Sequence, residues 1–514
     1  MASYGRDAKA GFLFGVLGRI SSTAAAMAST VILARLLTPH DFGVAATVFF
    51  FVQVAQRMTN LGLNTALIRV PELRDDHSST VFGLNMLFGV VGGLALALAA
   101  GWLGDFYRSA EATAAIPVAG LTFAIGSAGT VPGALLARQL RFKALTVIES
   151  TYGWIVAIAS VVLALIGFGY WSLVYSLLIG AVLDAVMKLW WAKWRPRFAF
   201  SRRALRELLS FGAGLHLKRL LDAVALSIDN MLVGRVLGLS ALGIYDKAFT
   251  SVTRAVTLVS YAGHTVSLSV LAQMQNDPER FRQAFRRITL GISAAAYPFL
   301  AGLAASAGPL FMLLFGPQWT GAVRPFQILC VAGALRIYAS YVSAAVQAKG
   351  YVWSEVWRQG VYVCLIVLAV AAGSTWGLNG VSVGILVATV IQTFLMVGLL
   401  ARIASVSFAE LLAPHLPGAV GAVLVGGAVT GLSLILDMTA VRLDVWARLG
   451  IELGLAMTTG LGYLLVCPFD ECRGLIRETL LDFAPALGKR LGFEGSVITS
   501  TLGRQTSLNS ETGR

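Results

Sequence analysis

The chain has 514 residues, of which 57% are hydrophobic and only 13% are charged, and its formal net charge is +14. Soluble domains carry about 25% charged residues, so this composition excludes an ordinary soluble enzyme. The basic residues are separated by long apolar stretches and form no sustained basic face, which argues against a nucleic-acid-binding protein.

Long runs without any charged residue predict the transmembrane helices. A bilayer core about 30 Å thick is crossed by about 20 apolar residues, so each run predicts one or two helices. The first run contains Arg19 and continues past its cluster of small residues, so we interpret it as a transmembrane helix and not as a signal peptide. The sequence predicts an all-α polytopic membrane protein with about fourteen transmembrane helices, near 10–36, 40–67, 81–103, 112–137, 146–167, 170–191, 208–234, 241–266, 287–315, 322–348, 354–373, 379–401, 416–436 and 446–468.

The distribution of lysine and arginine predicts the orientation. With the N-terminus inside, the inner segments hold 27 basic residues and the outer segments hold six. This excess places both termini in the cytoplasm. The longest inner connection, 188–209, combines basic residues with three tryptophans and is typical of an amphipathic segment on the cytoplasmic leaflet.

A charged corner occurs twice in the sequence. "TVILARLLTPHDFGVAA" and "NMLVGRVLGLSALGIYD" align at an offset of 200, which places Arg35 on Arg235 and Gly43 on Gly243. Six predicted helices separate the two copies, so both cross the membrane in the same direction. This arrangement is a parallel repeat, which suits alternating access.

Each residue of the first corner has an expected local role. Arg35 ends the first helix, where a cation suits the helix dipole and can reach the headgroups. Thr38, Pro39 and Asp41 are expected to be the N-cap, the first-turn proline and the N3 carboxylate of the second helix. We therefore interpret Arg35 as structural. Prolines 117, 132, 298 and 309 predict kinks in the fourth and ninth helices.

The repeat predicts the domain organisation. Two six-helix lobes surround a central cavity, and two helices follow them. The predicted boundaries are 1–191 for the N-lobe, 192–207 for a cytoplasmic linker, 208–402 for the C-lobe, 403–470 for the last two helices and 471–514 for a cytoplasmic tail whose end is disordered.

Two stretches resemble a known family. "VILARLLTPHDFGVAATVFFFVQVAQRMTNLGLNTALIR" and "DNMLVGRVLGLSALGIYDKAFTS" are similar to the two half-signatures of bacterial polysaccharide transporters, the Wzx-type flippases. Their superfamily also contains multidrug antiporters of the MATE type and lipid II flippases. The resemblance covers most of residues 10–410 and implies two lobes in a V around a cavity.

The resemblance also implies a function. The substrate would be a polyprenyl-diphosphate-linked oligosaccharide, flipped across the bacterial inner membrane for exopolysaccharide, lipopolysaccharide or capsule synthesis. Expected partners are membrane lipid, a proton or sodium ion, and a polysaccharide polymerase with export proteins. We expect no cofactor, no nucleic acid and no catalytic residue. The four cysteines form no paired pattern, so we also expect neither a disulfide nor a metal site.

Cations inside the membrane are the candidates for binding a diphosphate, because a guanidinium donates in a planar fork. The resembling lipid II flippases use arginines of the first, second and eighth helices, which favours Arg19, Arg57 and Arg254. Lys218, Arg219 and Arg336 are further candidates. The alternative is that these residues form structural pairs or extend to the membrane surface. For Arg336, a neighbouring tyrosine pair at 338 and 341 could provide that anchor.

Two acidic residues are candidates for ion coupling. Asp222 and Asp229 lie seven residues apart on one face of the seventh predicted helix. Protonation of such a buried carboxylate can couple proton flow to reorientation. Alternatively, Asp222 pairs with Arg219, and Asp229 with Asn230 caps a break in the helix.

Other functions are weighed by what each requires. A MATE-like antiporter of small cations is the main alternative, but its cavity should be acidic. A membrane glycosyltransferase needs a substantial outer loop, and the predicted outer loops are short. No GxxxxGK[ST] motif occurs, so the chain does not itself hydrolyse ATP. A scaffold without transport activity remains a further alternative.

Overall fold

The computed structural model of the chain is built from helices. It describes all residues except 1, 60–62, 71, 197–199, 204–220, 223, 226, 440–442 and 476–514. For helix residues 2–17, 19, 55–59, 63, 65, 69 and 261–266 it describes the backbone only. Within these described ranges there is no β-strand, in agreement with the predicted all-α fold.

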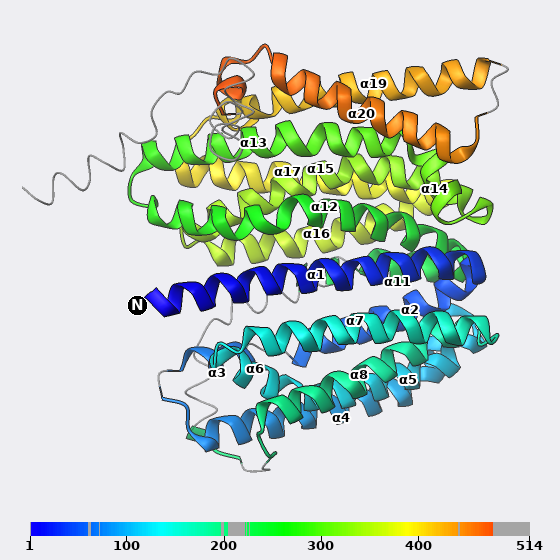
Figure 1. Ribbon diagram of the computed structural model, residues 1–514, viewed down its shortest axis with the longest axis vertical. Coiled ribbons are helices and arrows are strands. Elements are labelled where there is room, and N and C mark those ends of the chain that lie inside the picture. The colour runs from blue at the N-terminus through cyan, green and yellow to red at the C-terminus, as the bar shows by residue number, and fades with distance from the viewer. Residues whose placement is uncertain are drawn as a thin grey trace, which may run out of the picture.

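The helices form two groups that lie one above the other in Figure 1. The first group, here called the N-half, contains α1 (Ala2–Leu36), α2 (Pro39–Thr59), α3 (Leu63–Arg69), α4 (Asp75–Tyr107), α5 (Ala110–Ala128), α6 (Thr130–Arg138), α7 (Phe142–Leu165) and α8 (Trp171–Ala192). The second group, the C-half, contains α11 (Ile228–Leu237), α12 (Leu239–Gln273), α13 (Pro278–Ala305), α14 (Ala307–Leu314), η1 (Pro317–Ala322), α15 (Val323–Ala348), α16 (Val352–Gly373), η2 (Ser374–Trp376) and α17 (Gly377–Ala404).

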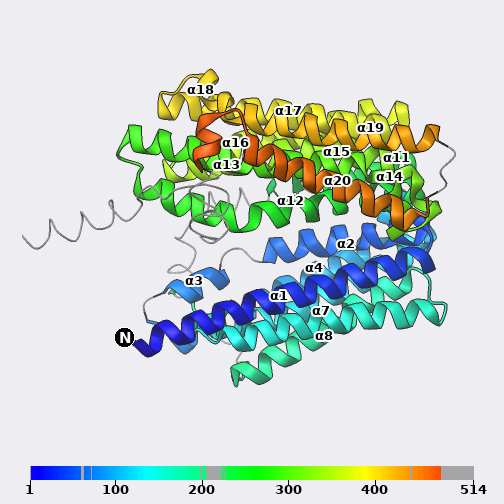
Figure 2. The same ribbon diagram turned by 45° about the horizontal axis from the view of Figure 1, so that its top comes forward.

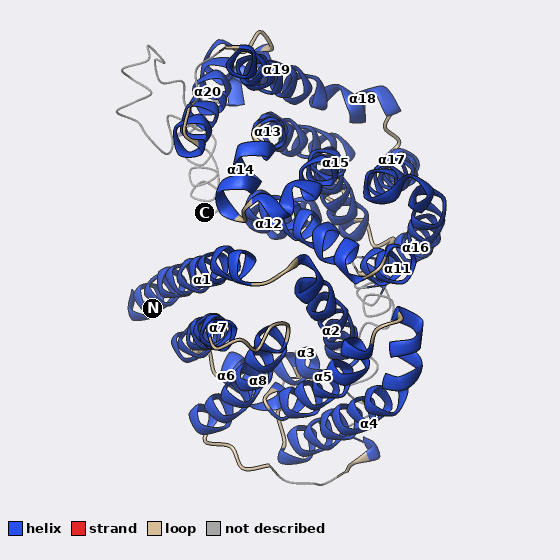
Figure 3. Cartoon of the chain, turned by 90° about the vertical axis from the view of Figure 1, so that its right-hand side faces the viewer, coloured by secondary structure: helices blue, strands red, loops and turns tan. Residues whose placement is uncertain are grey.

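The chain then adds a helical hairpin outside the C-half. After α18 (Phe408–Leu412) and η3 (Ala413–His415), α19 (Leu416–Met438) and α20 (Val445–Val466) pack against α13 and α14. Figure 3 shows the two helices at the margin of the molecule. His415 anchors the start of the hairpin, because its Nδ1 lies 2.8 Å from the Tyr297 hydroxyl and its ring stacks on Tyr297.

The bundle has two ends. The turns between α1 and α2 and between α11 and α12 lie at the same end, which the sequence predicts to face outward. We call it the predicted outer end. We call the opposite end, where α1 begins and α8 finishes, the predicted inner end. Figure 2 shows α1 running along α7 between these two ends.

Small residues bring α1 close to α7. A Cβ added to Gly18 would lie 2.2 Å from the Thr146 side chain, and one added to Gly153 would lie 2.8 Å from Ser22. Small residues at a helix interface allow this approach in a membrane, where lipid provides no hydrophobic drive for association. Gly18 and Ser22 of α1 therefore pack directly against Thr146 and Gly153 of α7.

Proline divides two of the predicted spans. The span 112–137 is interrupted after Ala128, and the span 287–315 is interrupted after Ala305. In each case the break lies four residues before a proline, Pro132 or Pro309. A proline ring collides with the carbonyl four residues back and leaves it without an amide donor. The kinks predicted at Pro132 and Pro309 are breaks, whereas Pro117 and Pro298 lie inside the continuous helices α5 and α13.

Apolar side chains cover the surface. Leu98, Trp102 and Val423 are each at least 70% exposed. Nine helical segments among the described residues are long and apolar enough to cross a membrane. Such a surface is stable in lipid and not in water, where exposed apolar patches are small. The chain is a multi-pass membrane protein, and the count of about fourteen helices stays a prediction.

Candidate functional site

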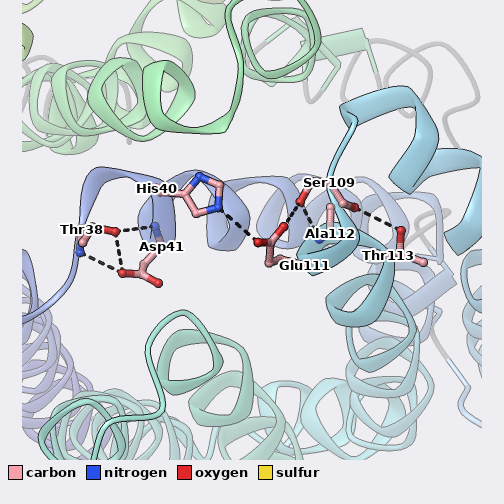
Figure 4. Close-up of polar contacts among 7 residues, drawn as sticks. All are labelled: Thr38, His40, Asp41, Ser109, Glu111, Ala112 and Thr113. Carbon is pink, nitrogen blue, oxygen red and sulfur yellow. Dashed lines mark hydrogen bonds and ion pairs between the residues drawn. The ribbon is translucent and has the colours of Figure 1, made fainter.

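The first corner at the predicted outer end is a capping box. The Thr38 hydroxyl accepts from the Asp41 amide at 3.2 Å, and an Asp41 carboxylate oxygen accepts from the Thr38 amide at 2.9 Å (Figure 4). These reciprocal bonds satisfy donors that begin α2. The expected roles of Thr38 and Asp41 are confirmed. The same figure shows His40 beside Glu111, with 3.8 Å between Nε2 and Oε1, which joins the starts of α2 and α5.

The two corners cross each other at equivalent residues. A Cβ on Gly43 would lie 1.8 Å from the carbonyl oxygen of Leu239. A Cβ on Gly243 would lie 1.8 Å from the carbonyl oxygen of Pro39. Both pairs are related by the offset of 200, so α2 and α12 meet about a pseudo-two-fold axis. Glycine is required at both positions because any side chain would separate the backbones.

Two arginines related by the repeat join the halves beside this crossing. Arg35 donates from Nη2 to the carbonyl oxygen of Leu313, at the end of α14. Arg235 donates from Nη1 to the carbonyl oxygen of Phe106, at the end of α4, over 2.9 Å. Each arginine therefore caps a helix C-terminus of the opposite half, where a cation is favoured by the helix dipole. We call Arg35 and Arg235 the arginine latch.

The structural role expected for Arg35 holds, but its partner differs from the expectation. The sequence suggested the C-terminus of its own helix and the lipid headgroups. The acceptor is instead 278 residues away in the chain. Two further donors bind the end of α1 from η1: the Gln318 amide and the Trp319 indole nitrogen both donate to the Ala34 carbonyl oxygen.

A buried lysine lies at the same interface. Lys247 is 4% exposed, and its Nζ lies 3.6 Å from the ring centroid of Phe42 in the N-half. Trp319 and Phe315 of the C-half surround it at 5.0 and 5.4 Å. We call these three rings the aromatic box. Cation–π attraction replaces part of the lost hydration, and Lys247 donates no hydrogen bond to any residue that the structure describes.

Four of the predicted diphosphate-binding cations lie partly or wholly outside the description. Arg19 and Arg57 have described backbones, in α1 and α2, but their side chains lie outside the described residues. Lys218 and Arg219 lie entirely outside them. Their roles stay predictions.

Arg254 lies on α12 at the boundary of the two halves. Its side chain is exposed, and Nη2 lies 3.4 Å from the Thr30 hydroxyl of α1. The hydroxyl of Thr30 meanwhile donates to the carbonyl oxygen of Ala26 at 2.6 Å. Asp246, two turns earlier on α12, attracts both Arg254 and Lys247 electrostatically. An Arg with one long hydrogen bond retains donors for an anionic ligand.

Arg336 and Asp229 are brought together inside the C-half. The Arg336 guanidinium carbon lies 5.2 Å from the ring centroid of Phe249, and the charges of Arg336 and Asp229 interact. Asp229 is 1% exposed and accepts from the Tyr245 hydroxyl at 2.8 Å. Its Oδ1 also accepts from the amide of Asn230 at 2.9 Å. Because Arg336 lies over a ring and attracts a carboxylate electrostatically, it has structural partners.

The tyrosine anchor expected as the alternative for Arg336 is absent. Tyr338 and Tyr341 are 4% and 1% exposed, so neither reaches the membrane surface. Asp222, the second candidate for coupling, is half-buried and has partners that are not described. The coupling role of Asp222 stays a prediction.

Sequence reasoning missed the buried charged residues Lys247, Glu355 and Glu452 and the half-buried Asp246. Lys247 and Asp246 are adjacent inside the predicted span 241–266, and this adjacency was a readable signal. Glu355 is 2% exposed at the predicted inner end of the C-half, where it accepts hydrogen bonds from Ser343 and Gln347. It was overlooked because it begins a predicted helix, a position where a solvated Glu is common.

A family model and three of the most similar relatives all point to proteins of polysaccharide biosynthesis. The model of the family described as polysaccharide biosynthesis protein matches residues 32–324, more than half of the chain. The teichuronic acid biosynthesis protein TuaB of Bacillus subtilis is 28% identical over 58% of this chain and 62% of its own length. The lipopolysaccharide biosynthesis protein WzxC of Escherichia coli is 23% identical over 71% of this chain and 75% of its own length. The succinoglycan biosynthesis transport protein ExoT of Rhizobium meliloti is 29% identical, over 60% and 63%.

Solved structures share the fold. The lipid II flippase MurJ in an inward closed conformation has a TM-score of 0.68 at 12% identity, covering 88% of this chain and 98% of its own. An inward-facing multidrug transporter of the MATE family has a TM-score of 0.57 at 18% identity, covering 75% and 96%. These likenesses establish the architecture. The alignments span less than two thirds of TuaB and of ExoT.

Proposed function

Because the chain belongs to the polysaccharide biosynthesis protein family, we propose that it flips a polyprenyl-diphosphate-linked oligosaccharide across the bacterial cytoplasmic membrane. It is a transporter and not an enzyme. Its relatives include a protein named for succinoglycan transport and one named for lipopolysaccharide biosynthesis. The MurJ likeness in fold agrees with movement of a lipid-linked substrate.

The proposed movement is alternating access of two lobes, 1–191 and 208–402, with 192–207 as the linker and 403–470 as accessory helices. The termini are cytoplasmic in this proposal, because the basic residues concentrate at that side. The arginine latch and the aromatic box then close the outer side. In this proposal, the conformation in which the outer side is closed is the one that loads substrate from the cytoplasm.

The single observation that carries the proposal is the exposure of the Arg254 side chain at the boundary between the two halves. A charged residue in a membrane helix is costly unless it faces a partner or a polar cavity. Arg254 is exposed at the boundary between the halves and has one long hydrogen bond to a residue that the structure describes. We propose that Arg254 binds the diphosphate together with Arg19 and Arg57, and that Lys218, Arg219 and Arg336 contribute more weakly.

We further propose that Asp229 or Asp222 couples transport to a proton or sodium gradient. Asp229 carries most of this proposal, since its buried carboxylate accepts from a tyrosine hydroxyl and interacts electrostatically with Arg336. A change in its protonation would alter both interactions. A polysaccharide polymerase and export proteins would act on the flipped substrate.

The test replaces Arg254 by Ala in the native host. We expect surface polysaccharide to be lost and the lipid-linked repeat unit to accumulate on the cytoplasmic side, with the protein still present in the membrane. Arg254→Lys should retain part of the activity. Arg324→Gln, an exposed arginine at the predicted outer end, serves as the control. Normal polysaccharide in the Arg254→Ala strain would contradict the proposed site.

The same strains discriminate the MATE-like antiporter. Such a transporter would change resistance to cationic drugs and leave the lipid-linked intermediate unaffected. The buried carboxylate of Asp229 is the observation in favour of it. Accumulation of the lipid-linked unit without a change in drug resistance would exclude it.

A further inference from the structure

A pocket of about 550 Å³ opens at the predicted inner end of the N-half. It lies between the start of α7 and the end of α8, on the far side of the N-half from the arginine latch. Its lining combines cations with indole rings and a single aliphatic side chain: Arg141, Leu189, Trp190, Trp191, Lys193, Trp194 and Arg195. No carboxylate is among the lining residues that the structure describes, so the charge of this described lining is entirely positive.

One of the three cations is held in place. Arg141 donates from Nη1 to the carbonyl oxygen of Trp191 at 2.7 Å, and its guanidinium carbon lies 5.9 Å from the Trp191 ring centroid. This contact caps the end of α8 and fixes the plane of the guanidinium. Its remaining N–H groups have no acceptor among the described residues, which leaves donors for an anion.

The other two cations have no structural role that the structure reveals. Lys193 and Arg195 are exposed just beyond α8. Neither side chain makes a hydrogen bond or an ion pair with any part of the chain that is described, and the backbone amide of Lys193 donates to the carbonyl oxygen of Trp190 at the end of α8. Nearby, Asp184 is already paired with Lys188 at 2.7 Å. The positive charge of the pocket is therefore uncompensated.

The indole rings place the pocket at the membrane surface. Trp194 packs on Phe82 with 5.3 Å between ring centroids, which ties the segment after α8 to α4. Trp190 is 73% exposed. Tryptophan prefers the headgroup region of a bilayer, where its ring is apolar and its N–H is hydrated.

An apolar strip leads away from the pocket. Val182, Val186 and Trp190 lie four residues apart on α8, and their exposed fractions are 43%, 57% and 73%. Residues four apart share one helix face, so the strip runs from the pocket toward the middle of the membrane. A ligand with both a phosphate and a hydrocarbon chain would fit this combination, because the phosphate meets the cations and the chain meets the strip.

We propose that this pocket binds the headgroup phosphate of an anionic phospholipid. Arg141 donates to the phosphate oxygens, Lys193 and Arg195 provide further charge, and the acyl chains lie along the strip on α8. The proposal requires only that the chain is a multi-pass membrane protein. It is separate from the transport proposal, since none of the residues lies at the boundary between the halves.

The experiment uses the full chain purified in a neutral detergent, titrated with phosphatidylglycerol and followed by native mass spectrometry. The test variant is Lys193→Gln/Arg195→Gln. The matched control is Arg287→Gln/Arg402→Gln, which removes two exposed cations of the same end outside the pocket. A cation near an anionic lipid surface contributes about 1 kcal/mol, so we expect the test variant to bind about 30-fold more weakly.

Three further probes identify the ligand class. Phosphatidylcholine should bind at least as weakly to the wild type as phosphatidylglycerol binds to the test variant. Inorganic phosphate and a polyglutamate peptide should not displace phosphatidylglycerol. Equal losses in the test and control variants would overturn the pocket assignment. Displacement by phosphate alone would assign a free anion, and displacement by the peptide would assign an acidic protein, and either result would overturn the lipid proposal.

Discussion

Removing the arginine latch should open the predicted outer end. The double variant Arg35→Gln/Arg235→Gln keeps polar side chains of similar length but loses both charged donors. Each arginine bonds a carbonyl of the opposite half, so the loss affects only the state in which the halves touch at that end. The folded interior of each half keeps its contacts.

The size of the effect follows from the geometry. A hydrogen bond from a charged donor contributes about 1.5–3 kcal/mol, and the lower value applies because both arginines are at least partly exposed. The two contacts involve different helices, so their effects should add to about 3 kcal/mol. If the open state makes up about 1% of the wild type, each single variant should raise it to about 10% and the double variant to about 60%.

Distances between spin labels measure these populations. Ile166→Cys in the N-half and Trp376→Cys in the C-half are suitable sites, because the native side chains are 63% and 75% exposed in turns of the predicted outer end. The four native cysteines are replaced first, since Cys364 is exposed. Double electron–electron resonance should then show one main distance in the wild type and a second, longer one in the double variant.

The control and the refuting result use the same labels. Arg324→Gln removes an exposed arginine of the same end that makes no hydrogen bond to the described chain, and it should leave the distances unchanged. If the double variant gives the same distribution as the control, the two arginines do not stabilise closure.

Three further predictions concern packing. Gly43→Ala should produce the longer spin-label distance without any change of charge, because its Cβ would collide with a backbone oxygen 1.8 Å away. Gly83→Ala is the control and should have no effect, because nothing lies within 4 Å of its Cβ. An unchanged distance in Gly43→Ala would disprove the tight crossing. Phe42→Leu should increase the open population about fivefold or more by removing the nearest ring of the aromatic box, and labelling at the same two sites checks this. Arg448→Gln should lower the midpoint of thermal unfolding in detergent by several degrees, because it leaves the fully buried Glu452 without its 3.1 Å partner, at a cost of about 3–5 kcal/mol. The double variant Arg448→Gln/Glu452→Gln should recover most of this loss. A double variant no more stable than the single variant would refute the pairing.

Local features of the sequence predicted the local structure well. The capping box at Thr38 and Asp41 and the breaks before Pro132 and Pro309 depend on atoms within four residues in the chain. Long apolar runs likewise predict membrane helices, because the bilayer requires every backbone group to bond within its own segment. These features could be read without knowledge of the neighbours in space.

The internal repeat predicted part of the tertiary structure but not the contact between the two halves. The alignment of Gly43 with Gly243 predicted two equivalent halves, but it did not show that the two glycines lie against each other's helices. That contact depends on how the halves are placed about their pseudo-two-fold axis. A repeat in the sequence shows that two elements are equivalent, but it does not give the distance between them in the fold.

The partners of the charged residues were decided by tertiary structure alone. Arg35 bonds a carbonyl 278 residues away, and Arg235 bonds one 129 residues away. Every residue offers the same backbone carbonyl, so no side-chain pattern marks the acceptor. Lys247 is similar, because three rings from distant segments make its burial possible. The sequence determined which cations enter the membrane region, and the packing of the two halves determined which of them hold the protein closed.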